Sequence, residues 1–233
     1  KNLIRIRRKY LRLQKQVCLQ IMGLGVSTFI MNITEAAISA VFNASLSRFG
    51  GDIYVTVMTV ATSVSQLAVM PIVGMGQGAQ PVTGYNYGAR EYERVRQCFR
   101  FLVISNVIYA TLAWIVLMLF PEQLIGIFNS DPGLMETAVP MFRVFFCMNF
   151  VMSFQMSAQN TFVAMGEAKK ATFFALFRKV LLLIPLILIL PRIGFGITGV
   201  FAAEPVADTI SATTCFVTFM LTAYRKMGQQ ERA

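Results

Sequence analysis

The stretch ATFFALFRKVLLLIPLILIL, residues 171–190, decides the class of fold because it is long and apolar enough to cross a lipid bilayer as a helix. Such a helix needs about 20 mainly apolar residues. Five further segments meet the same criterion: residues 17–46, 53–80, 99–120, 138–165 and 197–223. Short polar connections separate them at 47–52, 85–96, 121–133, 166–170 and 191–196. The sequence therefore predicts an all-α membrane protein with six transmembrane helices.

The composition agrees with a chain that lies mostly in lipid. Of the 233 residues, 56% are hydrophobic and 14% are charged, whereas soluble domains average about 45–50% apolar and about 25% charged residues. The chain has no histidine, which excludes Ser–His–Asp hydrolases, Cys–His proteases and His-ligated metal sites. The four cysteines are far apart and lie in or beside apolar runs, so we interpret them as small buried hydrophobes. We expect neither an enzyme nor a protein with a metal or organic cofactor.

The positions of the basic residues predict an orientation in the membrane. Residues 1–16, 90–100, 169–179 and 225–232 hold 18 of the 21 Lys and Arg residues, and these segments fall on one side of a six-helix topology. Because Lys and Arg accumulate on the cytoplasmic side, both ends of the segment are expected in the cytoplasm and the protein in the plasma (inner) membrane. Arg48 and Arg192 lie on the opposite side, and Arg143 lies within the fourth span. The net charge of +10 thus indicates topology, and we expect no nucleic-acid partner.

The chain divides into three predicted regions. Residues 1–16 form a basic linker helix, which either lies along the anionic inner leaflet or is a solvated connection. Residues 17–223 form the six-helix lobe, and residues 224–233 form a cytoplasmic tail. The chain begins at Lys1 with no signal peptide, so we expect a piece of something longer, cut within a loop.

Three acidic residues lie at depth in the predicted spans, where ionisable side chains are costly and tend to mark ion pathways. Glu35 is near the middle of the first span, and Glu204 and Asp208 share one face of the last span at i, i+4 spacing. We predict that Glu35, Asp208 and Glu204 bind a coupling cation. The alternative is that these acids pair with Arg143 or hydrogen-bond to neighbouring helices for packing alone.

Polar residues in the fourth span indicate where a substrate could bind. Some keep i, i+4 or i, i+7 spacing and could form a wet stripe, while interhelical hydrogen bonds would also explain them. Flexible Met and aromatic Phe side chains suit a pocket for varied organic cations, although most must pack or face lipid. The candidate lining residues are Met31, Asn32, Asn149, Ser153, Phe154 and Gln155.

The end of the second span, PIVGMGQGAQP at residues 71–81, holds two prolines and three glycines. Such a composition predicts a kinked or broken helix, a feature that recurs at transporter substrate and ion sites. The alternative is that its glycines serve only close helix contact.

Two motifs resemble those of the multidrug and toxic compound extrusion (MATE) transporters. GQGAQP at 76–81 followed by YNYGAR at 85–90 is similar to that family's pattern at the end of a span, and QNTFVAMGEAK at 159–169 is similar to its repeated end-of-span pattern. A weaker third match lies in the last span from Gly199 to Ser211. The motif residues that carry the resemblance or the helix break are Pro71, Gly76, Gln77, Gly78, Pro81, Asn86 and Gly88.

The resemblance covers essentially the whole chain, as the C-terminal six-helix lobe of a two-lobe, twelve-helix transporter. It implies secondary active efflux of organic cations or drugs by proton or sodium antiport, with alternating access between this lobe and a missing N-terminal lobe. It implies an acid on the first span, which Glu35 matches. Some members carry an aspartate on the fourth span, where this chain has only Gln155 and its polar neighbours.

Two other functions stay open. A lipid-linked oligosaccharide flippase would need a cavity rich in Arg and Lys, and this sequence offers only Arg143 at depth. A scaffold or non-functional fragment would give no transport.

Overall fold

The computed structural model describes residues 15–128 and 132–230, with the side chains of all of these except residues 15–28, 30, 31 and 230. Within these ranges the regular structure is helical and no strand occurs, which confirms the predicted all-α class. The elements in chain order are α1 (Lys15–Phe49), α2 (Asp52–Gly88), α3 (Tyr92–Leu119), α4 (Pro121–Gly126), α5 (Pro132–Phe146), η2 (Asn149–Val151), α6 (Met152–Ala164), α7 (Ala168–Leu176), η3 (Phe177–Leu183), α8 (Ile184–Ile189), η4 (Pro191–Phe195), α9 (Gly196–Phe219), η5 (Met220–Tyr224) and α10 (Arg225–Gln230). The predicted linker helix at 1–16 falls almost wholly outside the described residues.

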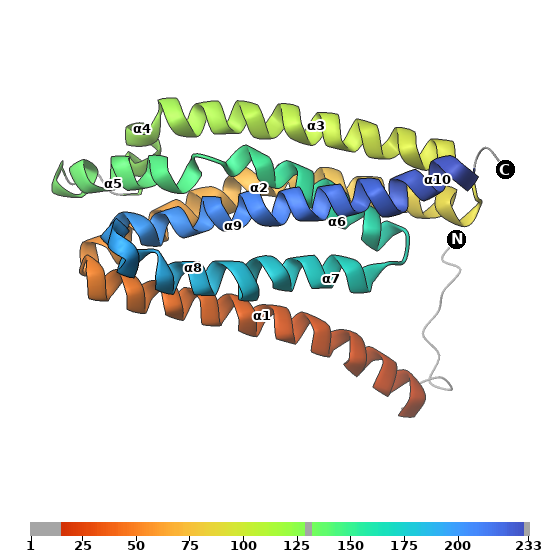
Figure 1. The fold of residues 1–233 in the computed structure, drawn as a ribbon, viewed down its shortest axis with the longest axis horizontal. Coiled ribbons are helices and arrows are strands. Elements are labelled where there is room, and N and C mark those ends of the chain that lie inside the picture. The colour runs from red at the N-terminus through yellow and green to blue at the C-terminus, as the bar shows by residue number, and fades with distance from the viewer. Residues whose placement is uncertain (1–14, 129–131, 231–233) are drawn as a thin grey trace, which may run out of the picture. The chain divides into compact units, whose positions relative to one another are not determined.

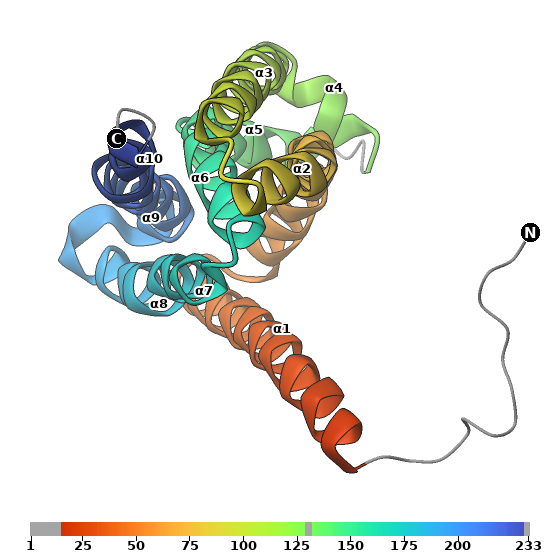
Figure 2. The same ribbon diagram turned by 90° about the vertical axis from the view of Figure 1, so that its right-hand side faces the viewer.

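Contacts divide the chain into residues 1–37 and residues 38–233. In the first unit the described residues form the first part of α1. In the second unit α2, α3 and α9 run lengthwise, and the α7–α8 segment runs beside α9 (Figure 1). Viewed along the helices, α6 lies among α2, α3 and α9, and it packs against all three (Figure 2).

Four helical runs among the described residues are long and apolar enough to cross a membrane: Asp52–Gly88, Tyr92–Leu119, Pro132–Ala164 and Ala168–Gln229. The last of these is 62 residues long, and it reverses direction where η4 meets α9 (Figure 1). Gly194 (φ 110°) and Gly196 (φ 52°) make this reversal, because glycine adopts positive φ without a steric penalty. The run therefore contains both the fifth and the sixth predicted spans.

The irregular part of the lobe is in a different span from the one predicted. α2 is one continuous helix of 37 residues that includes Pro71 and Pro81, so the second span is not broken there, and a kink at these prolines stays a prediction. Each proline removes one backbone donor, and neighbouring helices in a membrane protein accommodate that loss. The fourth span is interrupted instead, because α5 ends at Phe146 and the chain passes through the 3₁₀-helical η2 before α6 begins.

The core of the second unit consists of two apolar clusters. One joins the second half of α1 to α2, α5, α8 and α9, with Phe142, Phe146 and Phe201 fully buried. The other joins α3, α6, α7, α9 and α10 around Phe162 and Phe219. Six of the buried polar side chains lie on α3, α6 and α9, and we call them the polar layer: Asn106, Ser153, Gln155, Ser157, Asp208 and Ser211.

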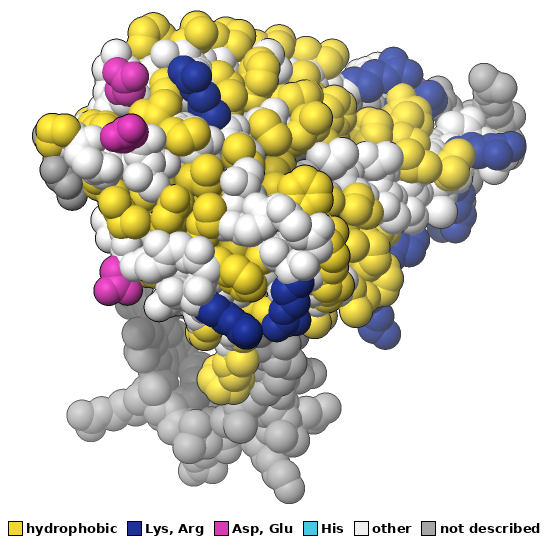
Figure 3. Space-filling view, turned by 60° about the vertical axis from the view of Figure 1, so that its left-hand side comes forward, with side chains coloured by type: hydrophobic (Ala, Val, Ile, Leu, Met, Phe, Trp, Pro, Cys, Tyr) yellow, Lys and Arg dark blue, Asp and Glu magenta, His cyan; other side chains and the backbone are white. Residues whose placement is uncertain are grey.

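Much of the remaining surface is apolar. Only 17–33% of the most hydrophobic window in each of the four runs is buried inside the molecule. Along α3 the exposed large side chains include Phe101, Ile104, Ile108 and Leu112, spaced three or four residues apart on one face of the helix. Hydrophobic side chains cover much of the described surface on the face in Figure 3. Such a surface is stable in lipid rather than in water.

Candidate functional site

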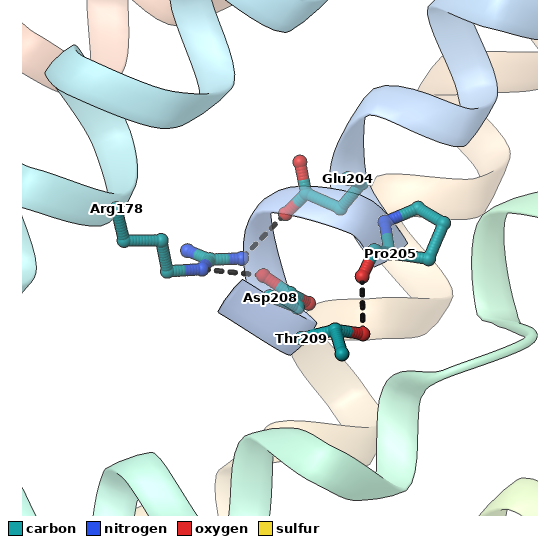
Figure 4. A network of polar contacts seen from close by, with 5 residues as sticks. All are labelled: Arg178, Glu204, Pro205, Asp208 and Thr209. Atoms are coloured by element: carbon teal, nitrogen blue, oxygen red, sulfur yellow. Dashed lines mark hydrogen bonds and ion pairs between the residues drawn. The ribbon is translucent and has the colours of Figure 1, made fainter. Parts of the chain in front are cut away.

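Two of the three predicted acids meet a partly buried arginine, Arg178 (Figure 4). Arg178 Nη2 donates to Glu204 Oε1 at 2.6 Å, and Arg178 Nε donates to Asp208 Oδ1 at 2.5 Å. The exposed fractions of the three side chains are 13% for Arg178, 18% for Glu204 and 6% for Asp208. We call these three residues the ion cluster.

The backbone of two elements brings the ion cluster together. Glu204 and Asp208 are one turn apart on α9, so both carboxylates face the same neighbour. Arg178 is in the π-helical segment η3, which packs on α9. At about 1.5 Å per residue, Arg178 is about 15 Å from the start of α7 and Asp208 about 18 Å from the start of α9. The ion cluster therefore lies well inside two antiparallel limbs, the α7–α8 segment and α9.

The pairing corrects two expectations about arginine. The acids were expected to pair, if at all, with Arg143, but Arg143 is exposed and their partner is Arg178. Arg178 was counted among the basic residues of the cytoplasmic side, whereas it lies inside the lobe. The signal in the sequence was a guanidinium near the middle of an apolar run, opposite two acids in the next run.

The ion cluster holds its own positive charge. Arg178 donates through separate nitrogens of one planar guanidinium, a geometry that fits carboxylate acceptors. Both carboxylates therefore already have a cation, the Arg178 guanidinium, beside them. Without Arg178, two carboxylates at this place would strongly attract another cation. No group of three or more Cys, Asp or Glu residues that could hold a metal occurs in the described part of the chain.

Glu35 belongs to the other unit. It is exposed on α1, as is its neighbour Asn32. The structure gives the two units separately, so it does not join Glu35 to the ion cluster. Met31 lies in the helix α1, but its side chain is outside the described residues.

The remaining candidate lining residues lie at and after the interruption in the fourth span. Ser153 and Ser157 are fully buried, and their hydroxyls donate to the Phe150 and Ser153 carbonyls. Ser157 also accepts a hydrogen bond from Asn106 of α3 at 2.9 Å. Phe154 packs edge-on against Phe216 at 5.2 Å between ring centroids. These contacts match the packing alternative, in which polar residues of this span form hydrogen bonds within and between helices.

Three polar atoms of the polar layer are buried without a hydrogen-bond partner: Gln155 Oε1, Asn106 Oδ1 and Ser211 Oγ. Asn149, the remaining candidate lining residue, is half-buried in η2 and is not part of this layer. Buried unpaired acceptors are costly, so this layer is the part of the lobe where water or a polar ligand group would be stabilised. Asn106 is a member that the sequence reasoning missed, because a lone Asn in an apolar span gives no periodic signal.

Residues of the two motifs make contacts between α2 and α6. Gln80 Nε2 donates to Asn160 Oδ1 at 3.2 Å, so the first motif contacts the second. A methyl group at Gly76 would overlap the Asn160 amide, so that amide would have to move away from its present position. Gln77, Gly78, Pro81 and Gly88 are exposed, and the Asn86 amide donates to the Val82 carbonyl at 2.8 Å. These residues thus serve helix contact and helix ends rather than a break.

Comparison with curated proteins identifies multidrug exporters as relatives. The multidrug export protein MepA of Staphylococcus saprophyticus is 23% identical over 223 residues, which cover 96% of this chain and 48% of that protein. MepA of Staphylococcus aureus strain N315 is 21% identical over the same length and coverage. This chain therefore spans about half the length of the curated relatives it matches.

Solved structures show the same fold. The inward-facing conformation of a multidrug resistance MATE family transporter of the MOP superfamily matches with a TM-score of 0.86 at 18% identity, over 98% of this chain and 52% of that one. A crystal structure of MATE in the bent conformation gives 0.83 at 18% identity, over 98% and 50%. The chain is therefore similar in fold to one half of these transporters. Residues 28–189 match the MatE family model, and the chain belongs to that family.

Proposed function

We propose that this chain is the C-terminal lobe of a secondary multidrug exporter, in which proton or sodium antiport drives outward transport of organic cations through alternating access between two lobes. The observation that carries the proposal is the coverage: nearly all of this chain aligns with about half of each MepA relative. One lobe supplies one wall of a central cavity, so a second lobe is needed. The basic segments support an orientation with both ends of the chain in the cytoplasm of the plasma membrane.

In this proposal Glu35 binds the coupling cation. Glu35 is exposed on α1, whereas Arg178 already neutralises charge at Asp208 and Glu204. An exposed carboxylate on the wall of an interlobe cavity is accessible to a proton or sodium ion and to a cationic drug. Competition between the two for one negative charge gives exchange, because binding of the coupling cation on the outside displaces the drug.

Asp208 and Glu204 have a second role in the proposal. Their ion pairs with Arg178 tie η3 to α9, so the two limbs move together when the lobe reorients. Protonation of either carboxylate would weaken that tie and make the geometry of the lobe sensitive to the coupling proton.

The test uses the two-lobe protein that carries this chain as its second lobe, reconstituted in proteoliposomes with a fluorescent cationic dye. We expect Glu35→Gln to lose most of the export driven by a pH or sodium gradient and to bind the cationic dye more weakly than the wild type. Glu122→Gln, which removes an exposed acid from the short helix α4, is the matched control and should export normally. Wild-type export by Glu35→Gln would remove Glu35 from the coupling mechanism.

A second arm tests the lobe assignment. The 233-residue chain alone, reconstituted at the same density, should give no gradient-driven export, and addition of the preceding lobe should restore it. Export by the isolated chain would contradict the two-lobe proposal.

A further inference from the structure

A small pocket of about 180 Å³ lies where α1 and α8 end, within the unit of residues 38–233. It is distinct from the ion cluster and from the polar layer. Its lining residues are mainly apolar, and they come from the last turns of α1 and from α8 and η4: Val41, Ala44, Ser45, Arg48, Phe49, Leu188 and Arg192.

Two arginines line this pocket, and no acidic residue does. Neither Arg48 nor Arg192 takes part in an ion pair with another described residue. The Arg48 guanidinium carbon lies 5.7 Å from the centroid of the Phe49 ring, which also lines the pocket. Two like charges beside one small pocket repel each other. An anion between the two guanidinium groups would be attracted to both, and that attraction would offset the repulsion.

The surroundings restrict the anion to an amphiphile. Ile189, Ile193 and Phe195 are exposed, and they lie where the run Ala168–Gln229 reverses direction, which is the end of its first membrane-crossing half (Figure 1). Arginines at such an end lie at the level of lipid headgroups, where a guanidinium forms bidentate hydrogen bonds with phosphate. A ligand with one phosphate and an apolar body fits the pocket and its rim together.

We propose that this pocket binds the headgroup phosphate of an anionic phospholipid between Arg48 and Arg192, with the acyl chains along the exposed apolar side chains of α8 and η4. A bound lipid would join the end of α1 to the turn between α8 and α9. The proposal depends on the geometry of this one unit, so it stands whether or not the chain exports drugs.

The experiment maps a lipid adduct on the purified chain in nanodiscs. A photoreactive phosphatidylglycerol is crosslinked, and peptides covering residues 41–49 and 188–193 are quantified by mass spectrometry. One basic residue near an anionic lipid contributes about a fivefold change in binding, so Arg48→Gln and Arg192→Gln should each lower the adduct about fivefold. The double variant should lower it more. Arg225→Gln, an exposed arginine on α10, should leave this adduct unchanged.

A second variant separates loss of binding from loss of folding. Ala44→Phe fills the pocket while both arginines stay, and it should also abolish the local adduct. Arg48→Lys with Arg192→Lys keeps the charge but not the bidentate geometry, and it should retain an intermediate level.

Three results would overturn the proposal. The first is an adduct that stays unchanged both in the double Gln variant and in Ala44→Phe, and the second is equal labelling by the phosphatidylcholine analogue. The third is displacement of the lipid by inorganic phosphate as effectively as by unlabelled phosphatidylglycerol. The last result would identify the site as one for free phosphate.

Discussion

We expect Arg178 to contribute strongly to the stability of the lobe. Its guanidinium contacts both Glu204 and Asp208, and removal of one partner from a buried ion pair costs about 3–5 kcal/mol because the other charge stays buried. We therefore expect Arg178→Met to lower the melting temperature of the detergent-solubilised chain sharply, as followed by size-exclusion chromatography after heating. The triple variant Arg178→Met, Glu204→Gln, Asp208→Asn should recover much of that loss.

The matched control is Arg143→Met, since Arg143 is an exposed arginine in the fourth span. Its melting temperature should stay close to that of the wild type. Equal melting temperatures for Arg178→Met and Arg143→Met would show that the ion cluster does not stabilise the lobe.

Gly76 and Gly78 offer a paired test of the contact between α2 and α6. A Cβ at position 76 would overlap the Asn160 amide, whereas one at position 78 would meet nothing within 4 Å. Gly76→Ala should destabilise the chain by about 1–3 kcal/mol, as overpacking does. Gly78→Ala should be neutral or slightly stabilising because alanine is the better helix former. Thermal unfolding in detergent measures both, and a loss of stability in Gly78→Ala alone would contradict the assignment.

At the scale of elements, the interruption of the fourth span has an identifiable support. Trp114 of α3 donates from Nε1 to the Cys147 carbonyl at 3.1 Å, in the segment between α5 and η2, and its ring lies edge-on to Phe150 at 5.5 Å. Trp114→Phe keeps an aromatic ring but removes the donor. It should cost about 0.5–1.5 kcal/mol through the lost hydrogen bond and speed the reaction of exposed Cys147 with a thiol reagent.

Tyr109→Phe is the control on the same helix, because the Tyr109 hydroxyl makes no hydrogen bond with another described residue. Its stability and thiol reactivity should match the wild type. If Trp114→Phe behaves in the same way, the bond to Cys147 does not hold the interruption in place.

The elements also show what the sequence could predict. Apolar length and positions of polar connections located the spans, because the bilayer sets the length of a helix that crosses it. The same reasoning did not find the interruption of the fourth span. Pro71 and Pro81 suggested a kink or break in α2, which continues as one helix, whereas the chain is interrupted at 147–151, which holds neither proline nor glycine. The contact between Gln80 and Asn160 and the ion pairs of Arg178 depend on which helix faces which, and one sequence does not contain that information.

At the scale of the whole molecule, the exposed surface predicts how the chain behaves in solution. Most of each membrane-spanning run is unburied, so water would contact far more apolar area than soluble proteins expose. We expect the purified chain to be monodisperse in detergent or nanodiscs and to aggregate when detergent is removed, as light scattering would show. A monodisperse chain in plain buffer would contradict the membrane assignment.

The π-helical segment Phe177–Leu183 has a consequence for comparisons between species. A π-turn carries one residue more than a regular turn at the same place. Deletion of a single residue there would restore a regular turn without rotating the rest of the helix, but side chains within the segment would change direction, and position 178 would no longer face Asp208. Orthologues that keep the arginine should therefore keep the extra residue as well, and an alignment gap in this segment should coincide with loss of the basic side chain.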